Sequence, residues 1–227
     1  MTTLDLRVYE NLEQRSPEWY EARLGVLTAS VVGKLVTPTM KVAKNDTSRG
    51  LTHMLAAERI TGFVVPTFQS DAMFRGVMDE PLARDLYSKL HANAVEVGFM
   101  VREIDGHKLG YSPDGLVGDD GLIEVKSADP KIHLARILSA DVPAEHMAQM
   151  QTGMLVSGRK WCDFVSYCGG MPMHVQRAHA IPEWFAAITE ALAAFEANVA
   201  DSLADYARIT DGLPTTERVN YDAEIRF

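Results

Sequence analysis

The segment YSPDGLVGDDGLIEVKS, residues 111–127, places acidic residues and a lysine in a pattern that could do chemistry. Glu124 and Lys126 are separated by one residue, so in a strand their side chains share a face. The Asp-Gly step between two apolar runs predicts a hairpin, which brings Asp114 beside Glu124. Two neighbouring carboxylates repel each other unless one is protonated or both bind a cation. The segment therefore predicts a cation site with a lysine beside it.

Carboxylate oxygens without imidazole or thiolate partners favour Mg²⁺ or Mn²⁺. Such an ion can hold a phosphate oxygen and lower the pKa of a bound water. Lys126 would then orient or deprotonate that water. A surface hairpin with a cross-strand ion pair between Glu124 and Lys126 would give the same sequence pattern, and on the pattern alone both interpretations stay open.

The elements that must position these residues alternate between helical and strand periodicity. Helices are expected at 16–25, 28–36, 51–62, 79–92, 143–158 and 182–211, and strands at 94–103, 108–118, 122–128, 161–168 and 173–181. Segment 37–50 is polar and basic without periodicity, which predicts a surface loop. This order predicts one α/β domain with a mixed sheet.

Composition limits the classes of function. The chain has 227 residues, 47% of them hydrophobic, and a formal net charge of -9, so a nucleic-acid-binding surface must be a local basic patch. Cys162 and Cys168 fit no common metal or redox spacing and are expected to be reduced. The N-terminal residues lack the apolar core of a signal peptide. No run approaches the roughly 18 apolar residues of a membrane span. A cytoplasmic protein without a membrane partner is expected.

The two halves of the hairpin, SPDG and GLIEVKS, resemble the PD-(D/E)XK nuclease motif. Three flanking segments, WYEARLGVLTAS, FRGVMDEPLAR and EHMAQMQTGMLVSG, are similar to the phage lambda exonuclease branch, also called the YqaJ-type viral recombinases. The resemblance runs from about Trp19 to about Tyr167. It implies a restriction-endonuclease-like core, with a central mixed sheet flanked by helices. The whole chain, 1–227, would be a single exonuclease domain that includes the C-terminal helix 182–211 and a short tail, 212–227.

The resemblance also implies roles for individual residues. Asp114 and Glu124 would be metal ligands together with the backbone carbonyl of Val125, and Lys126 would be the catalytic lysine. Glu80 would be an additional acidic residue near the metals. Its alternative is a glutamate in a first helical turn, stabilised by the helix dipole. The implied cofactor is Mg²⁺, with Mn²⁺ as a substitute, as two ions per active site.

Other positions of the family fall outside the hairpin. Arg23 would bind the 5′-phosphate of a DNA end, helped by Ser30 and nearby backbone N–H groups. Without the resemblance, the two residues favour a solvated arginine and a serine in a first helical turn. Gln149 matches a family glutamine near the active site. His146 stands where the family usually has a tyrosine. It would contact phosphate, protonate the leaving group, or only fill space.

The function implied is a Mg²⁺-dependent, alkaline-type 5′-to-3′ exonuclease. It would degrade one strand of double-stranded DNA to mononucleotides and leave 3′ overhangs for phage-type recombination. The implied partners are DNA ends with a 5′-phosphate, two further copies in a homotrimeric ring, and a single-strand annealing protein in a bacterial host cell. Candidate channel residues are Lys34, Met40, Lys41, Lys44, Arg49, Lys131 and Arg136.

Met40 could also wedge between terminal bases, unless 37–50 is only a disordered polar loop. Two other functions remain open from the sequence. The first is an endonuclease or repair nuclease of the same superfamily that cuts internally. The second is a DNA-end-binding recombination adaptor without catalysis, which has less need of crowded carboxylates. Two cysteines cannot supply a four-thiolate iron–sulfur cluster.

Overall fold

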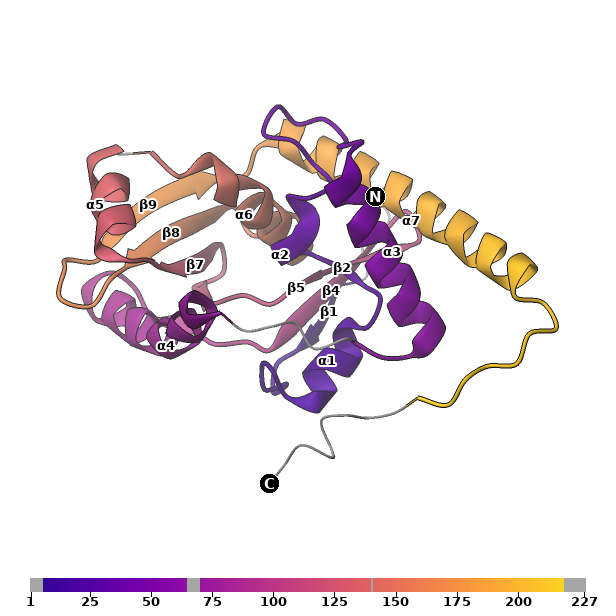
Figure 1. Ribbon diagram of the computed structural model, residues 1–227. Coiled ribbons are helices and arrows are strands. Elements are labelled where there is room, and N and C mark those ends of the chain that lie inside the picture. Colours follow the sequence, from indigo (N-terminus) through magenta and orange to yellow (C-terminus); the bar gives the residue numbers. More distant parts are fainter. Residues whose placement is uncertain (1–5, 65–69, 140, 219–227) are drawn as a thin grey trace, which may run out of the picture.

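The computed structural model describes residues 6–64, 70–139 and 141–218. Two mixed sheets lie beside each other, flanked by helices, as Figure 1 shows. The first has the order β1-β4-β5-β2, built from β1 (Leu6–Tyr9), β2 (Leu27–Thr28), β4 (Phe99–Ile104) and β5 (His107–Tyr111). The second has the order β3-β6-β7-β8-β9, built from β3 (Ala94–Val95), β6 (Gly115–Val117), β7 (Gly121–Ser127), β8 (Trp161–Tyr167) and β9 (His174–His179).

The described helices are α1 (Pro17–Arg23), α2 (Ala29–Val32), α3 (Asp46–Thr61), α4 (Asp71–Leu90), α5 (Pro130–Ser139), α6 (Ala144–Ser157) and α7 (Pro182–Ile209). Among the described residues, no helix combines the length and the apolar character that a membrane crossing requires. The two cysteines are buried and free, as expected. The last part of the expected tail, 219–227, lies outside the described residues.

Strand β7 lies in the middle of the second sheet, antiparallel to β6 and parallel to β8. Ile123 and Val125 point into an apolar cluster that includes Tyr87 and Val165. The intervening residues Glu124 and Lys126 therefore share the opposite face, as the two-residue period predicts. A strand buried on both sides normally reads as a continuous apolar run, so these two charges mark the position of a polar site.

The expected strand 94–103 is wrong, because the chain breaks into β3 and β4, which belong to different sheets. Gly98 lies at the break, where an added Cβ would come within 1.9 Å of the carbonyl oxygen of Leu12. Apolar residues that alternate along 94–103, and would share a face in one strand, differ in burial: Val95 is 53% exposed and Phe99 is fully buried. The expected strand 108–118 divides likewise into β5 and β6. Asp114 lies in the crossing between the two sheets.

Several helix boundaries differ from the expected ones. Helix α4 begins at Asp71, where Ser70 caps it by accepting from the Met73 amide, and it runs through Pro81. Pro81 removes one backbone hydrogen bond, but Ala83 and Tyr87 anchor the second half of the helix in the core. The expected loop 37–50 ends earlier, because Asn45 caps α3.

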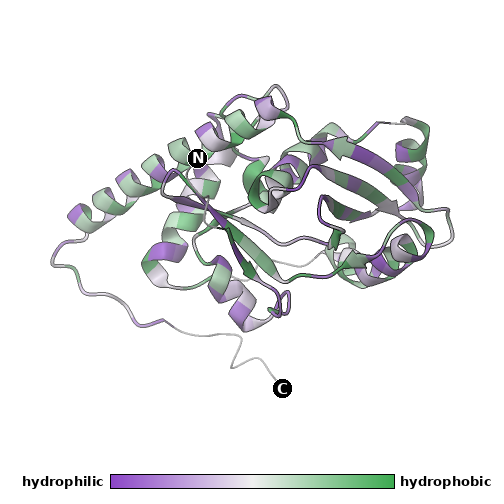
Figure 2. Ribbon diagram, turned by 180° about the vertical axis from the view of Figure 1, so that it is seen from behind, coloured by the Kyte–Doolittle hydropathy of each residue, from purple (hydrophilic) through white to green (hydrophobic). Residues whose placement is uncertain are grey.

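Two further differences come from short elements. Helix α2 has four residues where nine were expected at 28–36, because residues 27–28 extend into β2 and pair with β5. Strand β1 and helix α5 were not predicted. The expected C-terminal helix is confirmed as α7, whose buried stripe includes Ile188, Phe195 and Val199. Figure 2 shows hydrophobic and hydrophilic positions alternating along it.

Candidate active site

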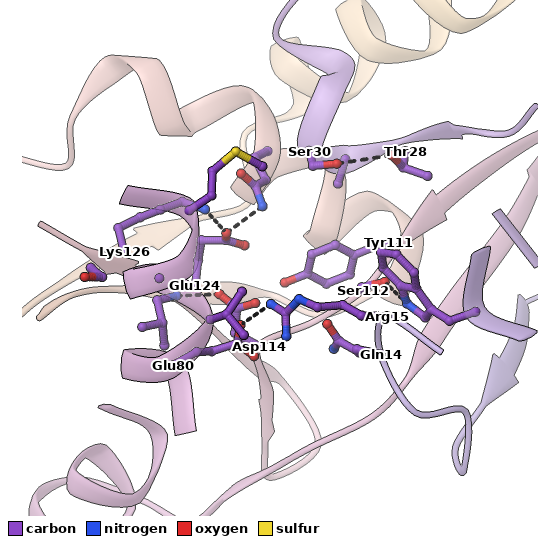
Figure 3. A pocket seen from close by; sticks show the side chains of 18 of the residues that line it. Gln14, Arg15, Thr28, Ser30, Glu80, Tyr111, Ser112, Asp114, Glu124 and Lys126 are labelled. Atoms are coloured by element: carbon purple, nitrogen blue, oxygen red, sulfur yellow. Dashed lines mark hydrogen bonds and ion pairs between the residues drawn. The ribbon is translucent and has the colours of Figure 1, made fainter. Parts of the chain in front are cut away.

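A cleft of about 770 Å³ lies between α1, α4, α6 and the crossing from β5 to β7. Figure 3 shows its lining: Glu80, Asp114, Glu124 and Lys126 lie on one side, and Tyr111, Ser112, Thr28 and Ser30 lie on the other. Asp114, Glu124 and Lys126 all line this cleft, with Glu80, Gln149, Arg23 and Ser30. The residues that the sequence assigned to catalysis and to phosphate binding therefore meet in one cavity.

Glu124 is the most deeply buried acid of the site, with no solvent exposure. Its Oε1 accepts hydrogen bonds from Lys126 Nζ at 2.6 Å and from Gln149 Nε2 at 2.5 Å. Its Oε2 is buried and has no hydrogen-bond partner among the described residues. Burial raises the pKa of the Glu124 carboxyl, and the positive charge of Lys126 opposes that shift only in part. A buried, unsatisfied carboxylate oxygen is costly unless a ligand completes it.

Asp114 lies beside Glu124, as the hairpin predicts. Its Oδ2 accepts a hydrogen bond of 2.6 Å from the Val125 backbone amide. The pKa of Asp114 is raised well above its usual range, first by burial and then by the negative charges of Glu124 and Glu80. The structure thus places the Val125 amide at the site, whereas the role of its carbonyl as a metal ligand stays a prediction.

Lys126 is cationic in this arrangement. Burial alone lowers the pKa of its ammonium, but the charges of Glu124 and Asp114 outweigh burial and raise that pKa overall. A lysine with a raised pKa is a poor base at neutral pH. The ammonium form fits the expected role of orienting a water. Deprotonation of that water by Lys126 stays a prediction.

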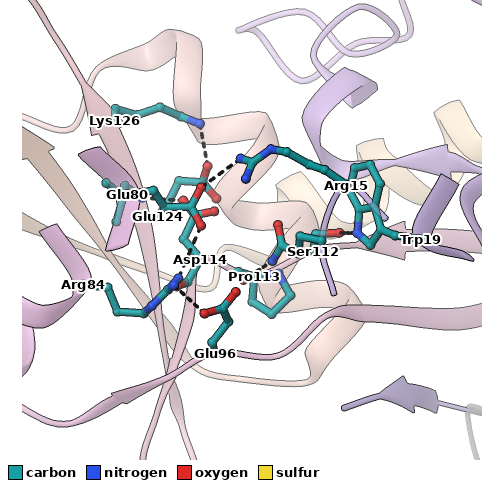
Figure 4. A network of polar contacts seen from close by, with 12 residues as sticks. Arg15, Trp19, Glu80, Arg84, Glu96, Ser112, Pro113, Asp114, Glu124 and Lys126 are labelled. Atoms are coloured by element: carbon teal, nitrogen blue, oxygen red, sulfur yellow. Dashed lines mark hydrogen bonds and ion pairs between the residues drawn. The ribbon is translucent and has the colours of Figure 1, made fainter. Parts of the chain in front are cut away.

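Glu80 projects from the middle of α4 and is held by two arginines, as Figure 4 shows. Arg15 Nη2 lies 3.2 Å from Glu80 Oε2, and Arg84 Nη1 lies 3.3 Å from Glu80 Oε1. Arg84 also donates to the Asp114 carbonyl at 2.6 Å and to Glu96 at 2.5 Å. Because α4 begins at Asp71, the alternative of a first-turn glutamate is wrong.

The sequence did not predict that Arg15 and Arg84 contact Glu80. The spacing of Arg84 from Glu80, four residues along one helix, is a signal for an ion pair. Nothing local marks Arg15.

The donor set fits a hard divalent cation. Two adjacent carboxyls with raised pKa values and one unsatisfied oxygen, all without imidazole or thiolate, match the ligands of Mg²⁺ and Mn²⁺. Within the described residues, no three His, Cys, Asp or Glu side chains converge tightly enough to hold an ion by themselves. Mg²⁺ commonly binds one or two carboxylates and fills its shell with water and phosphate oxygens.

Arg23 stands at the other end of the cleft. Its guanidinium donates to Ser112 Oγ at 3.1 Å and to Thr28 Oγ1 at 3.4 Å, and it stacks on Trp19 with 3.9 Å to the ring centroid. Burial lowers the pKa of Arg23 to about 10, so it stays positively charged at neutral pH. Hydroxyl partners leave its charge available for an anion, and an arginine fork suits phosphate.

Ser30 lies next to this group, with its Oγ 3.2 Å from Thr28 Oγ1. Helix α2 is only four residues long, so the expected contribution of a helix N-terminus is not supported, and the hydroxyl remains as the available contact. Trp19 Nε1 donates to Ser112 Oγ at 3.0 Å and fixes that hydroxyl beside Arg23. The sequence did not predict that Thr28 and Ser112 belong to the site.

His146 lies behind the cleft, stacked on Phe164 at 5.1 Å between ring centroids. Burial and the positive charges of Lys126 and Arg136 lower its pKa to about 3. Arg136 Nη2 lies 3.2 Å from His146 Nε2, which assigns Nε2 as the acceptor of a neutral ring. A neutral ring that accepts at Nε2 does not protonate a leaving group. The geometry instead gives His146 the role of holding Arg136.

The basic residues expected in a DNA channel are spread over two regions. Lys34, Lys41, Lys44 and Arg49 are exposed on or next to the connection from α2 to α3, and Arg49 pairs with Asp46. Lys131 is exposed on α5, whereas Arg136 is half-buried and donates to the Lys126 carbonyl at 3.4 Å.

Met40 is 37% exposed, in a turn closed by the Val36–Val42 bridge.

Comparisons with known proteins point in one direction. A family model described as the YqaJ-like viral recombinase domain matches residues 18–160. Two crystal structures of LHK-Exo, an alkaline exonuclease from Laribacter hongkongensis, superpose with a TM-score of 0.77 at 34% and 33% identity, and one of them is in complex with dAMP. Both alignments cover 88% of this chain and 100% of that chain.

A phage related exonuclease from Haemophilus somnus 129PT shares the fold, with a TM-score of 0.61, 15% identity and coverage of 80% of this chain and 96% of that chain. No curated protein sequence matches.

Proposed function

The chain belongs to the YqaJ-like viral recombinase family, and from this premise we propose that it is a Mg²⁺-dependent exonuclease that degrades one strand of double-stranded DNA from its 5′ end. Its products would be mononucleotides and a duplex with a 3′ overhang. The family and the 34% identity to an alkaline exonuclease support nuclease activity. The dAMP bound by that relative agrees with a mononucleotide product.

One observation supports the proposal that digestion starts from a 5′ end. Arg23 with its hydroxyl partners and the group of Asp114, Glu124 and Lys126 line the same cleft of about 770 Å³. A charged arginine whose side-chain hydrogen-bond partners are hydroxyl groups is suited to a terminal phosphate, which carries more negative charge than an internal phosphodiester. Binding the terminal phosphate at one end of the cleft would set the first phosphodiester at the other end.

The side chains of the site divide the work. A divalent cation held by Asp114 and Glu124 would lower the pKa of a bound water and hold a phosphate oxygen. Lys126, kept cationic by the carboxylates, would stabilise charge that develops on the phosphate. Gln149 holds Glu124 Oε1 and so fixes the direction of the carboxylate. Arg84 donates to the Asp114 carbonyl and so holds the backbone at Asp114 against α4, the helix that carries Glu80.

Assembly and partners form a second part of the proposal. The chain has a net charge of -9, so it must stay bound to DNA, a polyanion, despite overall electrostatic repulsion. A ring of three copies around the DNA would do so by enclosure, with the exposed lysines at 34, 41 and 44 turned toward the channel. A 3′ overhang would be passed to a single-strand annealing protein. Sedimentation velocity at micromolar protein tests the ring, and a monomeric mass would remove it.

Digestion of the same plasmid in linear and in covalently closed form, with Mg²⁺ and with EDTA, tests the nuclease proposal. We expect the linear form to disappear only with Mg²⁺ and the closed circle to persist. Rapid cleavage of the circle would indicate an endonuclease instead. Binding of linear DNA without digestion under any metal condition would indicate a recombination adaptor.

A further inference from the structure

Arg15 occupies the space between the two ends of the cleft. It lines the same cavity as Arg23, Asp114 and Lys126, and Figures 3 and 4 show its side chain reaching from the segment before α1 toward Glu80 and Asp114. Its Nη2 lies 3.2 Å from Glu80 Oε2. Neither the local sequence nor the residues assigned above give Arg15 a part in the reaction.

The backbone at Arg15 is strained, with φ at 71°, a left-handed conformation that favours glycine. Its two neighbours hold it there. Gln14 Nε2 donates to the Val97 carbonyl at 3.3 Å and to the Pro113 carbonyl at 3.1 Å. Ser16 Oγ accepts from the Trp19 amide at the start of α1. Strained residues that their surroundings hold in place are concentrated at functional sites.

Glu80 has two arginine partners of different character. The Arg84 side chain is 10% exposed and is fastened to the Asp114 carbonyl and to Glu96. The Arg15 side chain is 43% exposed, and within the described residues it forms a single ion pair, with Glu80. Exposed ion pairs are weak. A cation that approaches the carboxylates would therefore displace Arg15 and leave Arg84 in place.

We propose that Arg15 is a phosphate-contacting residue of the cleft, which neutralises Glu80 in the free protein and turns to a backbone phosphate of the DNA when a divalent cation engages the carboxylates. The inference rests on the nuclease proposal above. The planar guanidinium suits either partner, because carboxylate and phosphate both accept its two parallel N–H groups. Arg15 thus compensates the acidic cluster before DNA arrives and contributes to DNA affinity afterwards.

The test measures Mn²⁺ binding without DNA by isothermal titration calorimetry. It also measures affinity for a 5′-phosphorylated duplex in Ca²⁺, in place of Mg²⁺. For Arg15→Gln we expect Mn²⁺ affinity to rise about two- to fivefold, because Glu80 loses its competing cation. We expect duplex affinity to fall about tenfold, and the slope of log affinity against log salt to become shallower by roughly 0.9. Arg208→Gln is the control, because it removes an exposed arginine that is paired with one acid, Asp205, on α7.

Arg15→Gly provides a second variant, because glycine adopts φ 71° without strain and so keeps the fold. It is expected to reproduce both changes of Arg15→Gln.

Unchanged Mn²⁺ and duplex affinities in both variants, with 5′ digestion by the parent protein intact, would overturn the inference and leave the nuclease proposal standing. A parent protein that neither binds Mn²⁺ nor digests DNA would overturn both.

Discussion

Lys126 Nζ lies 2.6 Å from Glu124 Oε1 on one face of β7, while Glu124 Oε2 is buried without a hydrogen-bond partner among the described residues. One carboxylate is therefore half-satisfied by an ammonium and half-open to a ligand. The positive charge of Lys126 also offsets part of the repulsion between Glu124 and the neighbouring acid, Asp114.

Replacing Lys126 with methionine keeps the aliphatic stem and removes the charge. We expect digestion of linear duplex with Mg²⁺ to slow by at least about a hundredfold. Duplex affinity in Ca²⁺ should change less than digestion, because Lys126 is already paired with Glu124 and would act on charge that develops on the phosphate during the reaction. Lys160→Met is the control, since Lys160 pairs with Asp120 at 2.8 Å on the exposed surface. Near-parental digestion by Lys126→Met would exclude the lysine from the reaction.

Divalent cations should stabilise the protein in a pH-dependent manner. The pKa values of Asp114 and Glu124 are raised from 3.8 and 4.5 by burial. The relevant pH window runs from those unfolded-state pKa values up to the folded-state pKa values. Within it the folded protein binds more protons than the unfolded chain, so the free energy of unfolding falls as pH rises. A cation offsets this loss only where the carboxyls are ionised. Saturating Mg²⁺ should raise Tm by about 5 °C at about pH 8 and by less at about pH 5.5.

Thermal denaturation followed by circular dichroism checks the cation effect, with EDTA as the reference. Asp114→Asn should raise Tm in EDTA and lose most of the Mg²⁺ shift. Equal Mg²⁺ shifts at both pH values would show that the cation binds elsewhere.

Arg23 should decide which ends the enzyme accepts. Arg23→Ala should lower activity on 5′-phosphorylated duplex by about ten- to a hundredfold, the range for a hydrogen bond to a charged group. It should affect 5′-hydroxyl duplex much less. Initial rates on the two substrates measure the ratio, with Arg208→Ala as a control at an exposed arginine of α7. A parent protein that treats both ends alike would remove this role.

His146 should make the protein less stable in acid. Its folded-state pKa is about 3, below the ordinary 6.5. The stability that comes from keeping the ring neutral is present above pH 6.5 and is lost as pH falls toward about 3, because the unfolded chain takes up the proton first. His146→Gln should show a shallower loss of unfolding free energy over this range in urea titrations. It should also leave the pH dependence of digestion near neutrality unchanged, and a shift there would return His146 to proton transfer.

The local part of the site could be predicted from the sequence. Glu124 and Lys126 share a face because strands have a period of two, and a hairpin turn brings Asp114 to them. Those predictions are confirmed because they depend on short-range geometry. The assignments of Arg23 and Gln149 to the same cleft came from the resemblance, since no periodicity connects segments so far apart in the chain.

The parts of the fold and of the site that the sequence did not predict depend on packing between segments distant in the chain. Gly98 breaks the expected strand 94–103 because the Leu12 backbone passes against it, and the local alternation of apolar residues gives no sign of that contact. Arg15 reaches Glu80 across a sequence separation of 65 residues, from a strained turn held by Gln14. Neither contact leaves a local signal. Helix α4 begins earlier than the expected helix 79–92, because Ser70 caps its start at Asp71 and the helix continues through Pro81.

The polarity of digestion tests the central claim most directly. Linear duplex is labelled at the 5′ end or at the 3′ end of one strand and carries 5′-phosphates, and the products are followed with time in Mg²⁺. We predict that the 5′ label is released at once as a mononucleotide, while the 3′ label stays in long strands until late. Early release of the 3′ label, or loss of both labels with EDTA present, would contradict a cation-dependent enzyme that starts from the 5′ end.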